Sequence, residues 1–235
     1  MNLLALDTAT ECCSAALMIG GEIIERSEIA PRRHAELILP MIESLLGEAG
    51  ILRRQIDAIA VGRGPGAFTG VRLAISVAQG LALGLDVPVV PVSSLAALAQ
   101  DTPADIVAPI LAVVDARMGE VYAGTFLRGA DGMVAPIGTE SVGPASRLLL
   151  PQLAALGEQR WSIVGSGWDA YRDALSAHLP AAPLFTDGTR FPQARAIARL
   201  AAPHLAAGRG VAAEFALPVY LRDNVALTLK EQRAR

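Results

Sequence analysis

The stretch Val61-Gly62-Arg63-Gly64-Pro65-Gly66-Ala67-Phe68-Thr69-Gly70-Val71-Arg72 lies between a short apolar segment and a long apolar one. Its residues 62 to 70 hold four glycines and a proline. Such a density indicates a sharp turn, positive φ angles, or a close approach to another surface that a Cβ atom would block. The pattern predicts a strand, a tight glycine turn and the start of a helix.

Two interpretations of this turn are open. A glycine turn at a helix start can form a cradle of backbone N–H groups for a phosphate or another anion. It can equally be a tight connection that lets helix and strand pack closely. The motif G-x-x-x-x-G-K-[ST] is absent, because Val71 and Arg72 follow the last glycine, and Ala67 and Thr69 break G-x-G-x-x-G. The residues favour the second interpretation, close packing of the helix on the strand.

The apolar pattern on either side predicts alternating strands and helices. Asn2 to Leu6 reads as a buried strand, and two further strands, 12–19 and 22–29, form a hairpin joined by Gly20-Gly21. Ser93 or Ser94 caps a short helix that ends near 98. The other predicted strands are 56–61, 88–92, 106–114, 120–127 and 161–165, and the other predicted helices are 34–49, 69–84, 145–156, one that ends near 179, and 193–207.

Two of these predicted helices have more apolar surface than packing against one neighbouring element would bury. In the helix 34–49, apolar residues cover about half of the circumference, and Pro40 predicts a kink. In the helix 69–84, polar side chains beyond Arg72, Ser76 and Gln79 are nearly absent. A helix that is apolar all round must be covered on all sides. The pair therefore predicts either internal core or a surface that docks a partner.

Composition narrows the class of protein. Of 235 residues, 52% are hydrophobic and 18% charged, the formal net charge is −3 and the pI is about 5.6. This balance argues against a protein that grips RNA by its own electrostatics. No uninterrupted apolar run has membrane-spanning length and no signal peptide is evident, so we expect a cytoplasmic protein. His34, His178 and His204 stand far apart, and no metal site is predicted.

Several motifs together resemble the bacterial TsaB (YeaZ) family, over nearly the whole chain but more thinly between 140 and 215. They are the glycine stretch and the segments Leu6-Asp7-Thr8-Ala9-Thr10, Arg33-His34-Ala35-Glu36, Val92-Ser93-Ser94-Leu95, Asp115-Ala116-Arg117-Met118-Gly119-Glu120-Val121-Tyr122 and Pro218-Val219-Tyr220-Leu221-Arg222. The resemblance implies an α/β chain of two-lobed actin-like ATPase (ASKHA, ribonuclease H-like) fold. We expect lobes at 1–104 and 105–235, with the closing segment packing back on the first.

The resemblance also implies a role and partners. The family works in bacterial synthesis of threonylcarbamoyladenosine next to the tRNA anticodon, where it binds and positions the larger paralogue TsaD. The ATPase TsaE joins the complex, and tRNA is met only indirectly. Without its partner the chain would form a homodimer through the same helices. The residues expected at the interface are His34, Leu37, Met41, Leu45, Leu73, Ala74, Val77, Ala78 and Leu81.

Nucleotide binding is a separate expectation. In actin-like ATPases the turn after the first strand faces phosphate, which implies nucleotide contacts at Asp7 and Thr8, and the cradle interpretation of the glycine turn adds Gly64 and Gly66. A polar strand end capped by its own turn is the alternative. The hairpin of the second lobe carries Ala116, Arg117 and Met118 where such ATPases have glycines, and Arg117 and Glu120 would pair or reach across the cleft. We expect no cofactor of the chain's own, with ATP or ADP bound within the complex.

The sequence offers no nucleophile with a partnering base. G-x-S-x-G and H-E-x-x-H are absent, and neither Cys12 nor Cys13 has a histidine nearby in sequence. His34 is interpreted as a helix cap or a polar contact at the partner surface. We therefore predict no catalytic residue and a scaffold role. The competing classes are a free-standing actin-fold ATPase, an M22-type peptidase homologue and a self-associating structural protein.

Overall fold

The first lobe is built on a five-stranded mixed sheet. The structure is a computed structural model that describes residues 1–106, 108–148 and 160–222. The sheet order is β3-β2-β1-β4-β5, in which β1, β4 and β5 are parallel and the β1-β2-β3 meander is antiparallel. The strands are β1 (Asn2–Asp7), β2 (Cys12–Ile19), β3 (Glu22–Ile29), β4 (Ala58–Gly62) and β5 (Val89–Val92).

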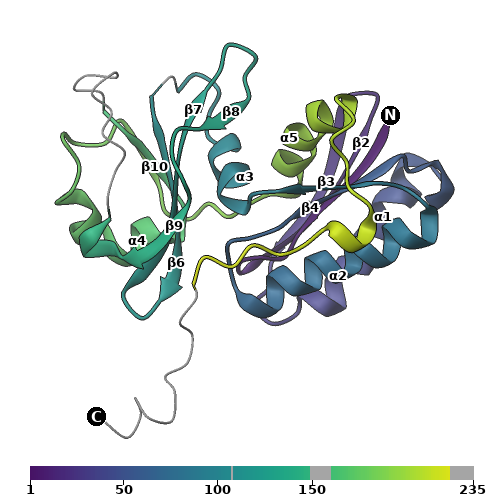
Figure 1. Ribbon diagram of the computed structural model, residues 1–235, viewed down its shortest axis with the longest axis horizontal. Helices are drawn as coiled ribbons and strands as arrows, with labels where there is room; N and C mark the ends of the chain where they lie inside the picture. The colour runs from purple at the N-terminus through teal and green to yellow at the C-terminus, as the bar shows by residue number, and fades with distance from the viewer. Residues whose placement is uncertain (107, 149–159, 223–235) are drawn as a thin grey trace, which may run out of the picture.

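Helices cover both faces of this sheet, as Figure 1 shows. On one face lie α1 (His34–Ala49) and α2 (Phe68–Leu85), and on the other lies α5 (Ala194–Ala206). The period-two alternation of the strands supplies both cores: Leu4 and Leu6 pack with α1 and α2, whereas Leu3 and Ala5 pack with α5. The first lobe therefore takes its second helical layer from a segment near the C-terminus.

The second lobe has its own sheet, in the order β11-β10-β6-β7-β8 with β9 pairing β7. Its helices α3 (Ser94–Gln100) and α4 (Ser166–Ser176) pack on opposite faces of β6. The strands are β6 (Ile110–Arg117), β7 (Glu120–Arg128), β8 (Val134–Pro136), β9 (Ser141–Pro144), β10 (Ser162–Val164) and β11 (Phe185–Asp187). Short 3-10 turns, η1 (Arg53–Gln55), η2 (Ala145–Arg147) and η3 (Ala213–Phe215), complete the described elements.

The structure departs from the sequence-based elements mainly in the second lobe. Strands β8, β9 and β11 were not predicted, and β6 begins at Ile110 rather than at residue 106. The predicted helix 145–156 begins as the short turn η2, and its residues 149–156 lie outside the described part of the chain. In the first lobe α1 continues through Pro40, which lies on its exposed side where a carbonyl without an intrahelical partner can face water.

The helix α2 is long and apolar enough to cross a membrane, by length and composition alone. One side of it belongs to the core of the first lobe, with Val71, Ala74, Ile75, Ala78 and Ala82 buried against the sheet. Only 33% of the helix is buried, however. The same helix therefore fills the core on one side and presents apolar residues on the other.

Close approach of backbone to backbone explains the glycine turn. A Cβ atom on Gly66 would lie 2.2 Å from the carbonyl oxygen of Ala9, and one on Gly70 would lie 2.0 Å from the carbonyl oxygen of Thr8. The backbone N–H of Ala67 donates to the Ala9 carbonyl at 2.7 Å. The close-packing interpretation of the turn is thus confirmed, and the contact fixes where α2 begins.

We predict that Gly70→Ala lowers the free energy of unfolding by roughly 2–4 kcal/mol, because the new methyl group must push the Thr8 backbone away. The matched control is Gly80→Ala in the same helix, where a Cβ atom meets nothing within 4 Å. That change should raise stability by about 0.5–1 kcal/mol, because alanine restricts the unfolded chain. Urea unfolding of both variants measures the difference, and similar losses at the two sites would contradict the packing argument.

Candidate functional site: an interlobe cleft and an apolar helix surface

Asp7 lies at the end of β1 with its carboxylate held inside the protein. Its Oδ1 accepts the backbone N–H of Ala9 at 2.8 Å, and its Oδ2 accepts the hydroxyl of Ser94 at 2.8 Å. A Cβ atom on Gly62 would lie 1.8 Å from the same Oδ2, so only glycine fits there. Burial raises the pKa of Asp7 to about 6, against the lowering effect of the two hydrogen bonds. The Asp7 carboxyl group is therefore fully buried and hydrogen-bonded within the chain.

The structure buries three of the four residues expected to contact a nucleotide. Asp7 and Thr8 are fully buried, and the Thr8 hydroxyl donates to the Gly70 carbonyl at 2.7 Å. Gly64 is buried as well, with the carbonyl oxygen of Val219 3.3 Å from the position of its absent Cβ. Gly66 alone of the four borders open space. The chain's own backbone packs closely on this turn, and a nucleotide contact at these residues stays a prediction.

A cleft of about 660 Å³ lies beside this turn, between the two lobes. Four segments line it: residues 9–11, residues 65–72, the β6–β7 hairpin and residues 219–222. At its rim the Arg72 guanidinium lies 3.6 Å from the centroid of the Phe68 ring, and its Nε donates to the Tyr220 hydroxyl at 2.6 Å. Sequence reasoning missed this cluster, although the i, i+4 spacing of Phe68 and Arg72 on α2 was a usable signal.

Ion pairs cross the rim of the cleft. Arg117 donates from the second lobe to Glu11 of the first at 2.7 Å, and also to Asp115 at 2.9 Å. Glu120 does not pair with Arg117; its carboxylate accepts from Arg222 in the closing segment. Arg117 was expected either to pair with Glu120 or to reach across the cleft, and in the structure it reaches across the cleft. The Arg117 side chain is 72% exposed, so water screens its ion pairs and each is worth roughly 0–1 kcal/mol.

The outward side of α1 and α2 is the second candidate surface. The structure shows that some of the residues expected at the interface are buried. Leu45, Ala74 and Ala78 are fully buried in the first-lobe core, so they cannot touch a partner in this conformation. The other six predicted interface residues keep part of their surface exposed: His34, Leu37, Met41, Leu73, Val77 and Leu81. Leu39 and Leu83, which were not predicted, are 50% and 77% exposed.

A groove of about 300 Å³ separates α1 from α2 at this surface. Its apolar lining includes Leu39, Leu46, Leu81 and Leu85, and Arg53 and Glu43 lie at its edge. The two helices thus pack on the same face of the sheet with a groove between them, and apolar side chains in the groove are accessible to solvent.

His34 is the first residue of α1 and does not cap it. The N-cap position belongs to Arg33, with no side-chain hydrogen bond there, so the capping interpretation of His34 is wrong. Its ring atom Nε2 is buried without a hydrogen-bond partner among the described residues. A contact of His34 with a partner stays a prediction.

Comparison with known proteins adds the family. A family model described as "TsaD: tRNA N6-adenosine threonylcarbamoyltransferase" matches residues 22–230. The Escherichia coli protein described as tRNA threonylcarbamoyladenosine biosynthesis protein TsaB is 40% identical over 96% of each chain, and the Haemophilus influenzae protein of the same description is 36% identical over 96% of this chain and 95% of its own. The chain belongs to the TsaB family.

Solved structures of the TsaB family agree in fold. Pseudomonas aeruginosa YeaZ superposes with a TM-score of 0.84 at 45% identity, over 94% of this chain and 99% of its own. A second P. aeruginosa structure with the same values is described as an uncharacterized protein with similarity to peptidase YEAZ. The two-lobed actin-like α/β fold expected from the sequence is confirmed. Within the described ranges no three His, Cys, Asp or Glu side chains are grouped so that they could hold a metal ion.

The buried Asp7 gives a prediction about pH. Its folded pKa of about 6 lies above the ordinary value of 3.8, so the protonated form favours folding, and the stability it contributes is lost as pH rises from about 4 to above 6. Asp7→Asn keeps the acceptor for Ala9 and carries no charge. We expect the unfolding free energy of the natural chain, relative to this variant, to fall by roughly 2–3 kcal/mol between pH 4 and pH 7. Urea titrations at four pH values test it, and a constant difference would contradict the buried charge.

Proposed function

We propose that this chain is a non-catalytic subunit that binds and positions a TsaD-type threonylcarbamoyltransferase during synthesis of threonylcarbamoyladenosine on tRNA. The observation that carries the proposal is the apolar outward side of α1 and α2 in a member of the TsaB family. The transferase would supply the catalytic residues. This chain would meet tRNA only through the complex, which we expect to be cytoplasmic and to include the ATPase TsaE.

The outward side of α2 supports docking by another helix. Arg72 is the one charged residue in its sequence from Phe68 to Leu85. Val77 and Leu81 are half-buried, and Gly80 and Gly84 are exposed with nothing within 4 Å of an added Cβ. Small residues between apolar ones let a second helix approach closely, and apolar surface of this extent marks partner interfaces. The groove beside α1 would take the side chains of the partner helix.

Two features of the chain support a role without a nucleotide of its own. The glycine turn packs against the backbone of residues 8 and 9, and the hairpin that borders the cleft places Ala116 and Arg117 in its lining. We therefore propose that ATP or ADP acts elsewhere in the complex, on the partner or at a shared interface.

The test is a mixing experiment with the transferase subunit from the same host. Size-exclusion chromatography with light scattering should show a heterodimer that replaces both separate species, including a homodimer of this chain. Reconstituted modification of a tRNA transcript then tests the function. If the two chains elute independently and modification proceeds without this one, the proposal is overturned.

A charge in the middle of the proposed interface gives a sharper test. Gly80→Glu should leave the monomer folded, since the site is open, and should weaken the heterodimer roughly a hundredfold, about 3 kcal/mol, by burying an unpaired carboxylate. Ala135→Glu introduces the same side chain at an exposed position on β8 in the second lobe and should bind normally. Equal affinity of the two variants would place the interface elsewhere.

Ala74→Asp and Ala78→Asp would not serve this test, because both alanines are fully buried and a carboxylate at either position would unfold the lobe. Exposed positions are therefore the ones that separate binding from folding.

The second candidate is an enzyme of the same fold, a free-standing ATPase or a peptidase. The peptidase is included because one similar solved structure is described by its similarity to a peptidase. An ATPase would raise its melting temperature with Mg-nucleotide alone, and a peptidase would cleave a casein substrate. A scaffold would respond to its partner and to neither of these probes.

A further inference from the structure

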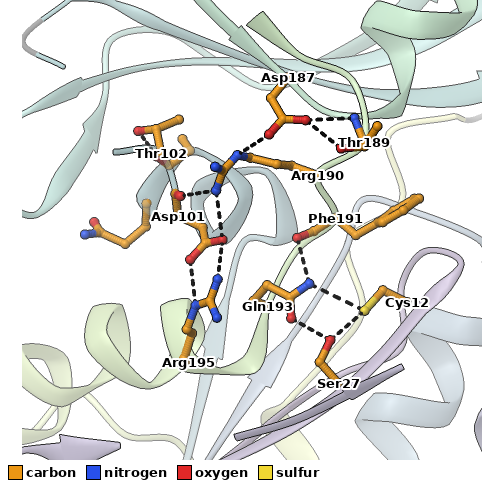
Figure 2. A network of polar contacts seen from close by, with 12 residues as sticks. Cys12, Ser27, Asp101, Thr102, Asp187, Thr189, Arg190, Phe191, Gln193 and Arg195 are labelled. Atoms are coloured by element: carbon orange, nitrogen blue, oxygen red, sulfur yellow. Dashed lines mark hydrogen bonds and ion pairs between the residues drawn. The ribbon is translucent and has the colours of Figure 1, made fainter. Parts of the chain in front are cut away.

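Two segments of the chain connect the lobes. The first joins β5 to α3 at residue 93, and the second, residues 188–193, leads from β11 back to α5. Figure 2 shows the side chains of the second connection beside Asp101, which follows the last residue of α3. Five residues form what we call the hinge cluster: Glu25, Asp101, Asp187, Arg190 and Arg195.

Asp101 is the centre of the hinge cluster. Its side chain is only 8% exposed and accepts two hydrogen bonds from the Arg195 guanidinium, from Nε to Oδ1 and from Nη2 to Oδ2, each at 2.8 Å. Arg190 donates to the Asp101 backbone carbonyl at 2.7 Å and to Oδ2 at 3.3 Å. The hydrogen bonds with Asp101 raise the pKa of Arg195. Bidentate pairs of this kind fix orientation as well as distance.

The cluster reaches the edge strand of each sheet. Arg195, in the first turn of α5, also holds Glu25 of β3, with its Nη1 3.0 Å from Oε2 and its backbone N–H 2.8 Å from Oε1. Arg190 also holds Asp187, at the end of β11, with its Nε 2.8 Å from Oδ2. A continuous chain of ion pairs therefore runs from β3 in the first lobe to β11 in the second.

Asp101 is itself carried by the second lobe. Leu95, Leu98 and Ala99 of α3 pack with β6 in the second core. The Arg128 guanidinium on β7 donates to the carbonyl and the hydroxyl of Thr102, at 3.1 and 2.7 Å. The ion pair between Asp101 and Arg195 of α5 is therefore a contact between the lobes and not within one of them.

We propose that the hinge cluster locks the angle between the two lobes, so that the cleft between them keeps a fixed width. Lobes joined by short connections move relative to one another unless their interface prevents it. The exposed pair of Arg117 with Glu11 is too well screened to do so. The cluster is shielded from solvent at its centre, and removal of Asp101 leaves two guanidinium groups without their shared partner. The lock is independent of what binds the chain.

The experiment measures the distance between nitroxide labels in the two lobes by pulsed electron resonance. Ser176→Cys at the end of α4 and Ala206→Cys at the end of α5 provide exposed sites. The natural Cys12 and Cys13 are 1% and 0% exposed, and the chain without added cysteines checks that they take no label. Dilution with unlabelled chain removes distances between copies. The natural hinge cluster should give one narrow distribution.

Asp101→Asn should widen that distribution about twofold while circular dichroism shows a folded protein. Arg190→Gln, which frees only the second connection, is measured beside it and should widen the distribution less. Glu43→Gln is the matched control, because it removes a carboxylate from an exposed ion pair with Arg53 inside the first lobe. An unchanged width in the folded hinge variants, or the same widening in Glu43→Gln, would overturn the lock.

Discussion

Contact between two stretches of backbone sets the position of the surfaces described above. The turn after β1 lies against residues 66–70 so closely that no side chain fits between them. Because α2 starts within that contact, its height over the sheet and its rotation are fixed, and so is one wall of the interlobe cleft. One steric constraint therefore fixes the position of the helix and excludes side chains from the glycine turn.

The two sides of α2 carry different side chains, one side facing the sheet and the other facing outward. Its inner row is made of Ala, Val and Ile that match the sheet, and its outer row alternates larger apolar residues with glycine and serine. Burial of apolar surface stabilises a protein by about 25 cal/mol per Å², so a cover over that outer row would be favourable. The 52% of hydrophobic residues in the sequence thus includes a core and exposed apolar side chains such as Leu39 and Leu83 on these helices.

The first lobe could be predicted closely from sequence because its signals are local. Gly20-Gly21 fixed a hairpin whose two strands were placed to the residue, and Gly50 in the left-handed region ended α1 as expected. The second lobe has three-residue strands, such as β8 and β11, that exist only by pairing and leave no periodic pattern. Periodicity also failed to say which row of α2 faces the core, since both rows are apolar. The cleft cluster and the hinge ion pairs join residues far apart in the sequence, beyond the reach of any local signal.

The late position of α5 bears on how the protein is made. All five strands of the first sheet have been synthesised once Val92 is added, yet the helix that covers Leu3 and Ala5 starts only at Ala194. Through the whole translation of the second lobe, one face of that sheet has no native cover. Contacts of such sequence separation form slowly and leave sticky intermediates. Residues 1–104 by themselves therefore leave that face of the sheet without its native helix until α5 is synthesised.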